Sequence, residues 1–128
     1  MNRYVFQDVS GELHERGEVN NHHVWFNRRR YTSPLDKKFR NLGGFVLPLL
    51  IPIHKDLHAE VPPPQKPEAR VMRETIEYSA QIRHENPYDQ FLKLATFLED
   101  RVPDRIIENL QSQAPFILEG QVKAVRNE

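Results

Sequence analysis

The feature that most constrains the fold is a run of prolines in the middle of the chain. Three consecutive prolines occupy positions 62 to 64, and Pro67 follows. Because proline lacks a backbone N–H donor, such a run favours a stiff, extended connection over a helix or a central strand. We therefore predict an internal boundary at 62–67, between an N-terminal region, 1–61, and a C-terminal region, 68–128. A chain of 128 residues is expected to pack these regions into a single domain.

Apolar residues after the prolines recur at helical spacing. This spacing predicts helices over 68–84 and 88–100 and a further helix that starts at Asp104. Pro115 to Val125 is expected to form a last short helix. The residues expected to form the core of this half are Phe91, Leu94, Leu98, Ile106, Ile107 and Leu110.

The N-terminal region mixes strand and helix signals. The first 21 residues contain short alternating patterns that suggest strand fragments or an irregular arm, and residues 22–26 suggest a short strand. Ser33 followed by proline predicts the start of a helix over 34–42. A buried strand is expected over 45–51, and one or two helical turns over 54–60. The predicted fold is therefore α+β and mostly α: a short β-hairpin plus a helix, with a helical C-terminal half.

Composition excludes several classes of protein. The sequence has no cysteine, which removes disulfides, thiolate zinc sites and iron–sulfur clusters. The formal net charge is zero, which argues against a protein that coats nucleic acid over its whole surface. The longest apolar stretch, residues 45–53, is too short to span a bilayer. We expect a soluble cytoplasmic protein with no membrane partner.

Four of the six histidines form two close groups. His54 and His58 are four residues apart, so on a helix both imidazoles lie on one face, where two neutral rings can meet one divalent cation. This spacing alone is more typical of a solvated helix face than of a metal site. His22 and His23 are adjacent; at the end of a strand one can bind a metal while the other takes a proton from water.

Together, the pair at 22–23, Asn41 and the His-x-x-x-His segment 54–58 resemble the HNH, or ββα-metal, nuclease motif. The resemblance is to the histidine-rich version found in the DNase colicins, and it covers residues 20–60. It implies a β-hairpin followed by a helix, wrapped around one divalent metal. Here the interval between the two histidine groups contains an additional predicted helix.

The resemblance also implies a role for each matching residue. His23 would be the general base, and Asn41 would hold the hairpin loop in shape. The implied metal is a divalent cation such as zinc, nickel, magnesium or manganese. The implied ligands are His22, His54 and His58.

A basic segment follows the paired histidines. Residues 28–40 hold six basic side chains and one acidic one, Asp36. They can bind phosphates next to the metal, or they can be a solvated charge run before a helix. The residues expected to contact nucleic acid, DNA in preference to RNA, are Arg28, Arg29, Arg30, Tyr31, Lys37, Lys38 and Arg40.

Two functions remain open from the sequence. One is a metal-dependent nucleic-acid phosphodiester hydrolase of HNH type, or an inactive relative that keeps the metal site. The other is a non-catalytic, zinc-stabilised interaction module whose helical half binds a protein partner or a second copy. A small phage-like accessory protein would fit either function.

Overall fold

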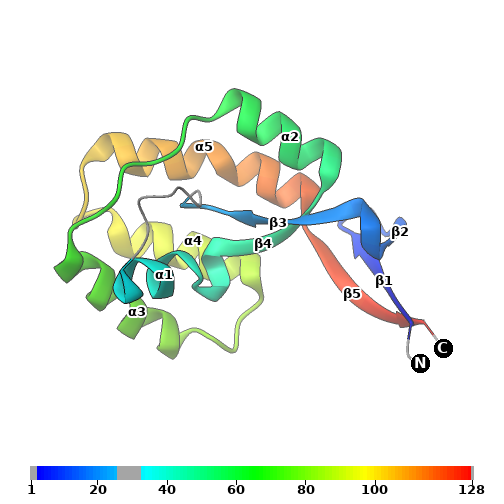
Figure 1. Cartoon of the computed structure of the whole chain (residues 1–128), viewed down its shortest axis with the longest axis horizontal. Coiled ribbons are helices and arrows are strands. Elements are labelled where there is room, and N and C mark those ends of the chain that lie inside the picture. Colours follow the sequence, from blue (N-terminus) through cyan, green and yellow to red (C-terminus); the bar gives the residue numbers. More distant parts are fainter. Residues whose placement is uncertain (1–2, 26–32, 128) are drawn as a thin grey trace.

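The computed structural model describes residues 3–25 and 33–127, and there the chain is α+β and mostly helical, as predicted (Figure 1). One antiparallel sheet has the strand order β2-β1-β5, and a second pairs β3 with β4. The strands are β1 (Arg3–Asp8), β2 (Leu13–Glu15), β3 (Val19–His23), β4 (Val46–Leu50) and β5 (Val122–Asn127). The helices are α1 (Pro34–Arg40), α2 (Ile51–Glu60), α3 (Ala69–Gln81), α4 (Pro87–Leu98) and α5 (Asp104–Gly120), with single 3-10 turns at η1 (Arg16–Glu18) and η2 (Gly43–Phe45).

The centre of the molecule is a ββα unit made of β3, β4 and α2. In the β3–β4 register, His22 lies opposite Leu47 and His23 lies opposite Val46. α2 begins directly after β4 and contacts both strands. β4 continues through Pro48, whose register partner is Asn21. Among the described residues, the other edge of β4 makes one isolated bridge, so a missing N–H donor is tolerated there.

α1 lies in the long connection between the two central strands. The hydroxyl of Ser33 caps this helix by accepting the backbone N–H of Asp36 at 3.2 Å. The Asp36 carboxylate is buried and forms an ion pair with Lys66, 2.8 Å away in the proline-rich connection. α1 is therefore fixed against the segment that links the two halves. The helix predicted here is confirmed, and it ends at Arg40.

The C-terminal half is helical, as predicted, and α4 packs against both α3 and α5. Asn86 caps α4 by accepting the backbone N–H of Asp89 at 2.9 Å. All the residues predicted to form the core of this half are buried: Phe91, Leu94, Leu98 and Leu110 are 0% exposed, Ile106 is 4% and Ile107 is 8% exposed.

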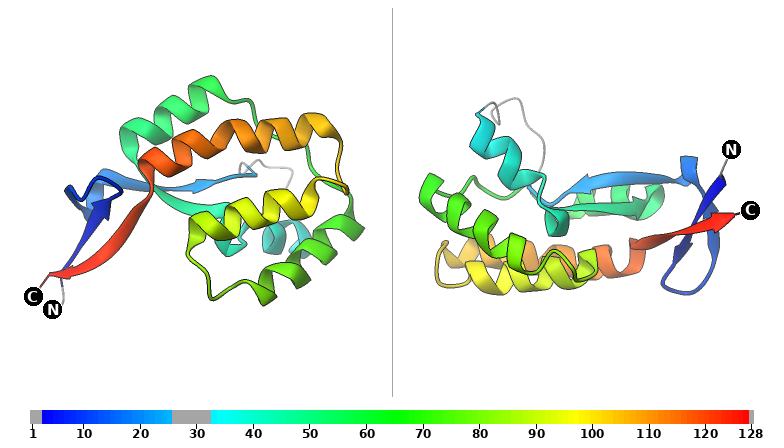
Figure 2. Two further views of the ribbon diagram at one scale, coloured as in Figure 1. Left: turned by 180° about the vertical axis from the view of Figure 1, so that it is seen from behind. Right: turned by 90° about the horizontal axis from the view of Figure 1, so that it is seen from below.

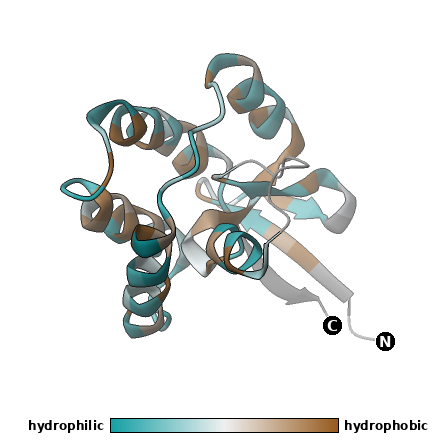
Figure 3. Ribbon diagram, turned by 60° about the vertical axis from the view of Figure 1, so that its left-hand side comes forward, coloured by the Kyte–Doolittle hydropathy of each residue, from teal (hydrophilic) through white to brown (hydrophobic). Residues whose placement is uncertain are grey.

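One apolar core joins the two halves. The rings of Trp25, Phe39 and Phe45 pack together with centroid distances of 4.8, 4.7 and 5.3 Å. Leu57 of α2 and Ile117 of α5 are fully buried in the same cluster. Figure 3 shows that the helices carry both hydrophobic and hydrophilic stretches, as helices that cover a core must.

Several boundaries differ from the predicted ones. No separate helix begins at Pro115, because α5 runs through this residue as far as Gly120. Pro115 is exposed and Ile117 is fully buried, so packing outweighs the missing hydrogen bond. Residues 122–127 form β5 instead of a helical end. The strand predicted over 22–26 ends at residue 23, and the helix predicted over 54–60 begins earlier, in the first turn after β4.

The strands nearest the two ends of the chain form an arm. β1 pairs with β5 over their whole lengths and with β2 on its other edge. Figure 2 shows this sheet projecting from the helical body, with the two ends side by side. Of the strand fragments predicted for the first 21 residues, β1 thus pairs with a strand more than 100 residues away in sequence, and β2 pairs with β1.

α5 approaches α2 closely at Gly120. A Cβ atom at this position would lie 2.8 Å from Cγ2 of Ile53 in the first turn of α2. Side chains do not approach this closely without displacement, so the contact requires glycine. The position of α2, and of the side chains it carries, depends on this contact.

Candidate metal centre

Three histidines converge between β3 and α2. His58 Nε2 lies 2.8 Å from His54 Nε2, and one ring nitrogen from each of His22, His54 and His58 lies within 4.8 Å of the others. The centroid of the His22 ring is 5.2 and 5.5 Å from those of the two helical rings. Two nitrogens on a tetrahedral ion, with bonds of about 2.0–2.1 Å, lie roughly 3.3 Å apart. Small side-chain rotations would bring the three rings to that geometry.

The local structure explains why these rings meet. The i, i+4 spacing puts His54 and His58 on one face of α2. Leu57, on another face, is fully buried in the core and fixes the rotation of the helix. Asp56 lies between the two histidines in sequence, but it is exposed and does not belong to this group.

His22 is the buried member of the group, with 0% of its surface exposed. Burial lowers the pKa of His22 from 6.5 to about 4, so the ring is neutral at neutral pH. Its Nε2 lies 2.9 Å from Oε1 of Gln113, a residue of α5 that is also fully buried. Gln113 could not be predicted from the sequence, because no local pattern marks a partner 91 residues away.

The other two rings face partly into solvent. His54 is half-buried and His58 is exposed. Burial lowers the pKa of both rings below the usual 6.5, and the neighbouring imidazoles add to this effect at His54. Three neutral imidazoles are a set of ligands that suits zinc, nickel or another transition metal. Because solvent reaches one side of the group, a metal there would keep one coordination position open to water or substrate. The residues present therefore fit a divalent cation.

His23 lies next to this group but has a different partner. Its Nε2 is 3.2 Å from Oδ1 of Asn41, the C-cap residue directly after α1. Partial burial lowers the pKa of His23, so its basic form persists at neutral pH. The structure thus brings His23 and Asn41 together, although α1 and its flanking segments separate them in sequence.

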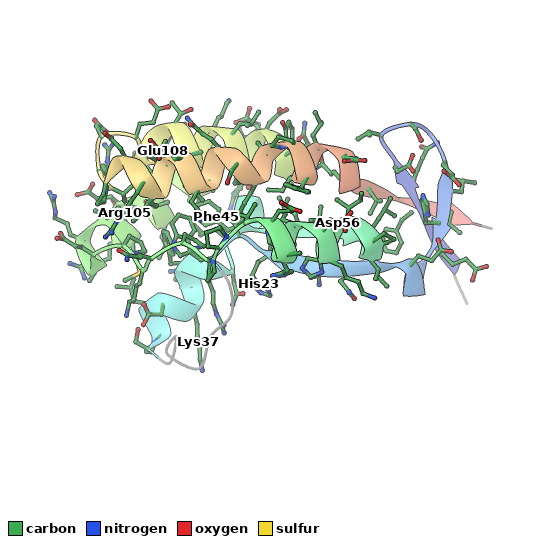
Figure 4. All side chains as sticks on the ribbon, turned by 90° about the horizontal axis from the view of Figure 1, so that it is seen from above. His23, Lys37, Phe45, Asp56, Arg105 and Glu108 are labelled. Carbon is green, nitrogen blue, oxygen red and sulfur yellow. The ribbon has the colours of Figure 1, made fainter. Side chains whose placement is uncertain are left out.

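The predicted basic residues divide into two sets. Lys37 and Lys38 are exposed on α1, and Arg40 is half-buried at its end. Figure 4 shows His23 and Lys37 on one side of the molecule and Glu108 of α5 on the opposite side. The other predicted nucleic-acid contacts, Arg28, Arg29, Arg30 and Tyr31, lie outside the described residues.

A second group of polar side chains lies on the arm. His14 of β2 is partly buried, and its two ring nitrogens lie 2.9 Å from Oδ2 of Asp8 and 3.0 Å from Oε2 of Glu18. Asp8 also accepts hydrogen bonds from the backbone N–H groups of Ser10 and Glu12. These hydrogen bonds stabilise the turn between β1 and β2, and this structural role accounts for the proximity of Asp8, Glu12 and His14.

Among the described residues, no helix combines the length and apolar character needed to cross a membrane. Comparisons of the chain with protein-family models, with curated proteins and with solved structures give no match.

Proposed function

We propose that this protein is a metal-dependent phosphodiester hydrolase that acts on nucleic acid, with DNA the favoured substrate. The observation that carries the proposal is the convergence of His22, His54 and His58 directly beside a fourth histidine, His23, that Asn41 orients. The pairing of β3 with β4, followed by α2, gives a strand pair and a helix as in the motif that the sequence resembles, with α1 between the two strands.

The three converging imidazoles would hold the cation. All three have lowered pKa values, so they are in the neutral form that binds a metal at neutral pH. A cation held there would supply charge stabilisation for a phosphate oxygen and for the leaving oxygen. The solvent access at His54 and His58 gives a phosphate group a route to the site.

His23 would act as the general base. The Oδ1 atom of Asn41 can only accept a hydrogen bond, so the proton on the His23 ring lies on Nε2 and the lone pair on Nδ1. Nδ1 is then the atom that takes a proton from the attacking water. A positioned base of this kind contributes about 100- to 10,000-fold to the rate.

α1 would contribute to the nucleic-acid contacts. Lys37 and Lys38 are exposed and lie a few residues from Asn41, which contacts His23. Two exposed cations near the reacting group would bind phosphates flanking the cleaved bond. Local positive charge of this kind is compatible with a net charge of zero.

The second candidate is a zinc-stabilised module without catalysis. The bond between His22 and Gln113 favours it, because a metal at this site would fasten the ββα unit to α5. In that case the metal would raise the free energy of unfolding, and His23 would have no role.

Cleavage of supercoiled plasmid separates the two candidates. The assay compares magnesium, manganese, nickel and zinc, with a chelator as the control. A hydrolase gives nicked or linear product that the chelator abolishes and that His23→Ala reduces. Equal, chelator-insensitive background from wild type and His23→Ala would eliminate the hydrolase and leave the zinc-stabilised module.

A further inference from the structure

We propose that Gln113 and Asn109 of α5 are positioning residues that fix the His22 ring with its proton on Nε2 and its lone pair on Nδ1, so that Nδ1 is the metal ligand. This inference rests on the proposed function, since it says how the same metal site is held. It assigns a role in the site to the C-terminal half of the chain.

The observation is a chain of three hydrogen bonds that leads away from His22. His22 Nε2 lies 2.9 Å from Oε1 of Gln113. Nε2 of Gln113 donates to Oδ1 of Asn109 at 3.1 Å. Nδ2 of Asn109 donates to the backbone carbonyl oxygen of Pro62 at 2.6 Å. The chain thus runs from β3 through α5 to the proline-rich connection.

The donor and the acceptor of each bond can be assigned by starting at the Pro62 end of the chain of hydrogen bonds. The carbonyl of Pro62 can only accept, so Asn109 must present its NH₂ group there and its oxygen to Gln113. Gln113 must then present its own NH₂ group to Asn109 and its oxygen to His22. An amide oxygen only accepts, so His22 must carry the proton on Nε2.

Burial makes this orientation strict. Gln113 and His22 are both 0% exposed, so water does not compete for these groups. Reversing the Gln113 amide would put its oxygen against Oδ1 of Asn109, and these two acceptors cannot form a hydrogen bond; the loss of this bond would cost about 1–3 kcal/mol. A neutral imidazole in water populates both tautomers, whereas His22 is restricted to one. Such partners of metal-binding histidines typically change metal affinity by about 10- to 100-fold.

The first test measures the tautomer without any metal. In chelator-treated wild-type protein labelled with ¹⁵N-histidine, the chemical shifts of the His22 ring nitrogens should show a protonated Nε2 and an unprotonated Nδ1. Gln113→Glu keeps an acceptor oxygen and should keep this tautomer. Gln113→Met removes the acceptor at similar volume and should give a mixture of tautomers. Protonation of Nδ1 in the wild type would overturn the proposal, and this result is independent of any variant's stability.

The second test measures zinc affinity by competition with a chromophoric chelator. Gln113→Met should bind zinc about 10- to 100-fold more weakly than wild type, and Gln113→Glu should bind at least as tightly as wild type. Gln111→Met is the matched control, because Gln111 is exposed on the same helix and should change nothing. Asn109→Ala should show a smaller loss of zinc affinity, and its His22 ring should populate both tautomers.

The two proposals fail differently in these experiments. If wild type binds no metal but His22 shows a single Nε2-protonated tautomer that Gln113→Met abolishes, the positioning role stands and the metal site fails. If wild type binds zinc and Gln113→Met binds it equally with the same His22 tautomer, the positioning role is overturned and the metal site stands.

Discussion

Nε2 of His23 lies 3.2 Å from Oδ1 of Asn41, although the two residues are 18 positions apart in sequence. This contact joins the end of β3 to the end of α1, and it leaves the other ring nitrogen of His23 as the basic atom. The segment between β3 and β4 that contains α1 therefore brings Asn41 to His23, although Asn41 lies 13 residues before His54 in sequence.

This contact predicts the effect of removing the base. His23→Ala should leave zinc affinity and the free energy of unfolding near wild-type values but lower plasmid cleavage by about 100-fold or more. Asn41→Ala should lower cleavage less, because the base remains but its orientation is lost. His84→Ala is the control, since His84 is exposed in the segment before α4. A His23→Ala variant that cleaves at the wild-type rate would contradict the assignment of the base.

The lysines of α1 predict a salt-dependent effect on binding. Replacing Lys37 and Lys38 by glutamine should weaken DNA binding and reduce the slope of log affinity against log salt by up to about 2, because each phosphate contact contributes about 0.9. Lys93→Gln is the matched control: Lys93 lies on α4, which carries none of the proposed site residues, and forms an ion pair with Glu85. Fluorescence anisotropy at several salt concentrations measures both slopes. An unchanged slope in the double variant would place the DNA contacts elsewhere.

The close contact between Gly120 and Ile53 predicts that adding one methyl group at position 120 destabilises the fold. Gly120→Ala should lower the free energy of unfolding by about 1–3 kcal/mol, because the new Cβ forces α2 away from α5. It should also weaken zinc binding, since α2 carries His54 and His58. Gly17→Ala, where a Cβ would meet nothing within 4 Å, should stay within about 0.5 kcal/mol of wild type. Chemical denaturation of both variants checks this, and equal stabilities would contradict it.

The arm has a pH dependence with a definite sign. The hydrogen bond that His14 donates to Asp8 raises the pKa of His14 above 6.5, and the hydrogen bonds that Asp8 accepts from Ser10 and His14 lower the pKa of Asp8 from 3.8 to about 2. The contribution of His14 to stability is therefore complete below pH 6.5 and is lost as pH rises through its raised pKa. The contribution of Asp8 is complete above pH 3.8 and is lost as pH falls towards 2.

NMR titration measures the coupling between these two groups directly. Asp8→Asn should lower the pKa of His14 towards its ordinary value of 6.5, because the bonding partner loses its charge. Glu12→Gln is the control, since Glu12 is exposed and is not a cause of the His14 shift. An unchanged pKa of His14 in Asp8→Asn would show that the ion pair does not form in solution.

The sequence predicted those features that arise from neighbouring residues. Ser33 followed by proline marks the start of a helix, and the i, i+4 spacing of His54 and His58 puts their rings on one face, because capping and helical periodicity are local. The apolar periodicity after the prolines likewise predicted a buried core, and its residues are buried.

The features that were missed depend on distant partners. Gln113 looks like any polar helical residue until α5 packs beside β3 and brings it to His22. The strand at residues 122–127 exists because β1 supplies its hydrogen-bonding partners. Pro115 is a local signal for a break between two helices, but the burial of Ile117 two residues further on outweighs it, and α5 continues. Local patterns contain no information on these contacts, which arise only from tertiary packing.

The metal content of the purified protein tests the central claim most directly. Protein prepared without a histidine tag and equilibrated with zinc should retain about one equivalent after desalting, as measured by mass spectrometry of the elements. His54→Ala should lose this zinc and the stability it provides, while His84→Ala should retain both. Absence of zinc from the wild type, or equal zinc in wild type and His54→Ala, would contradict a metal centre at His22, His54 and His58.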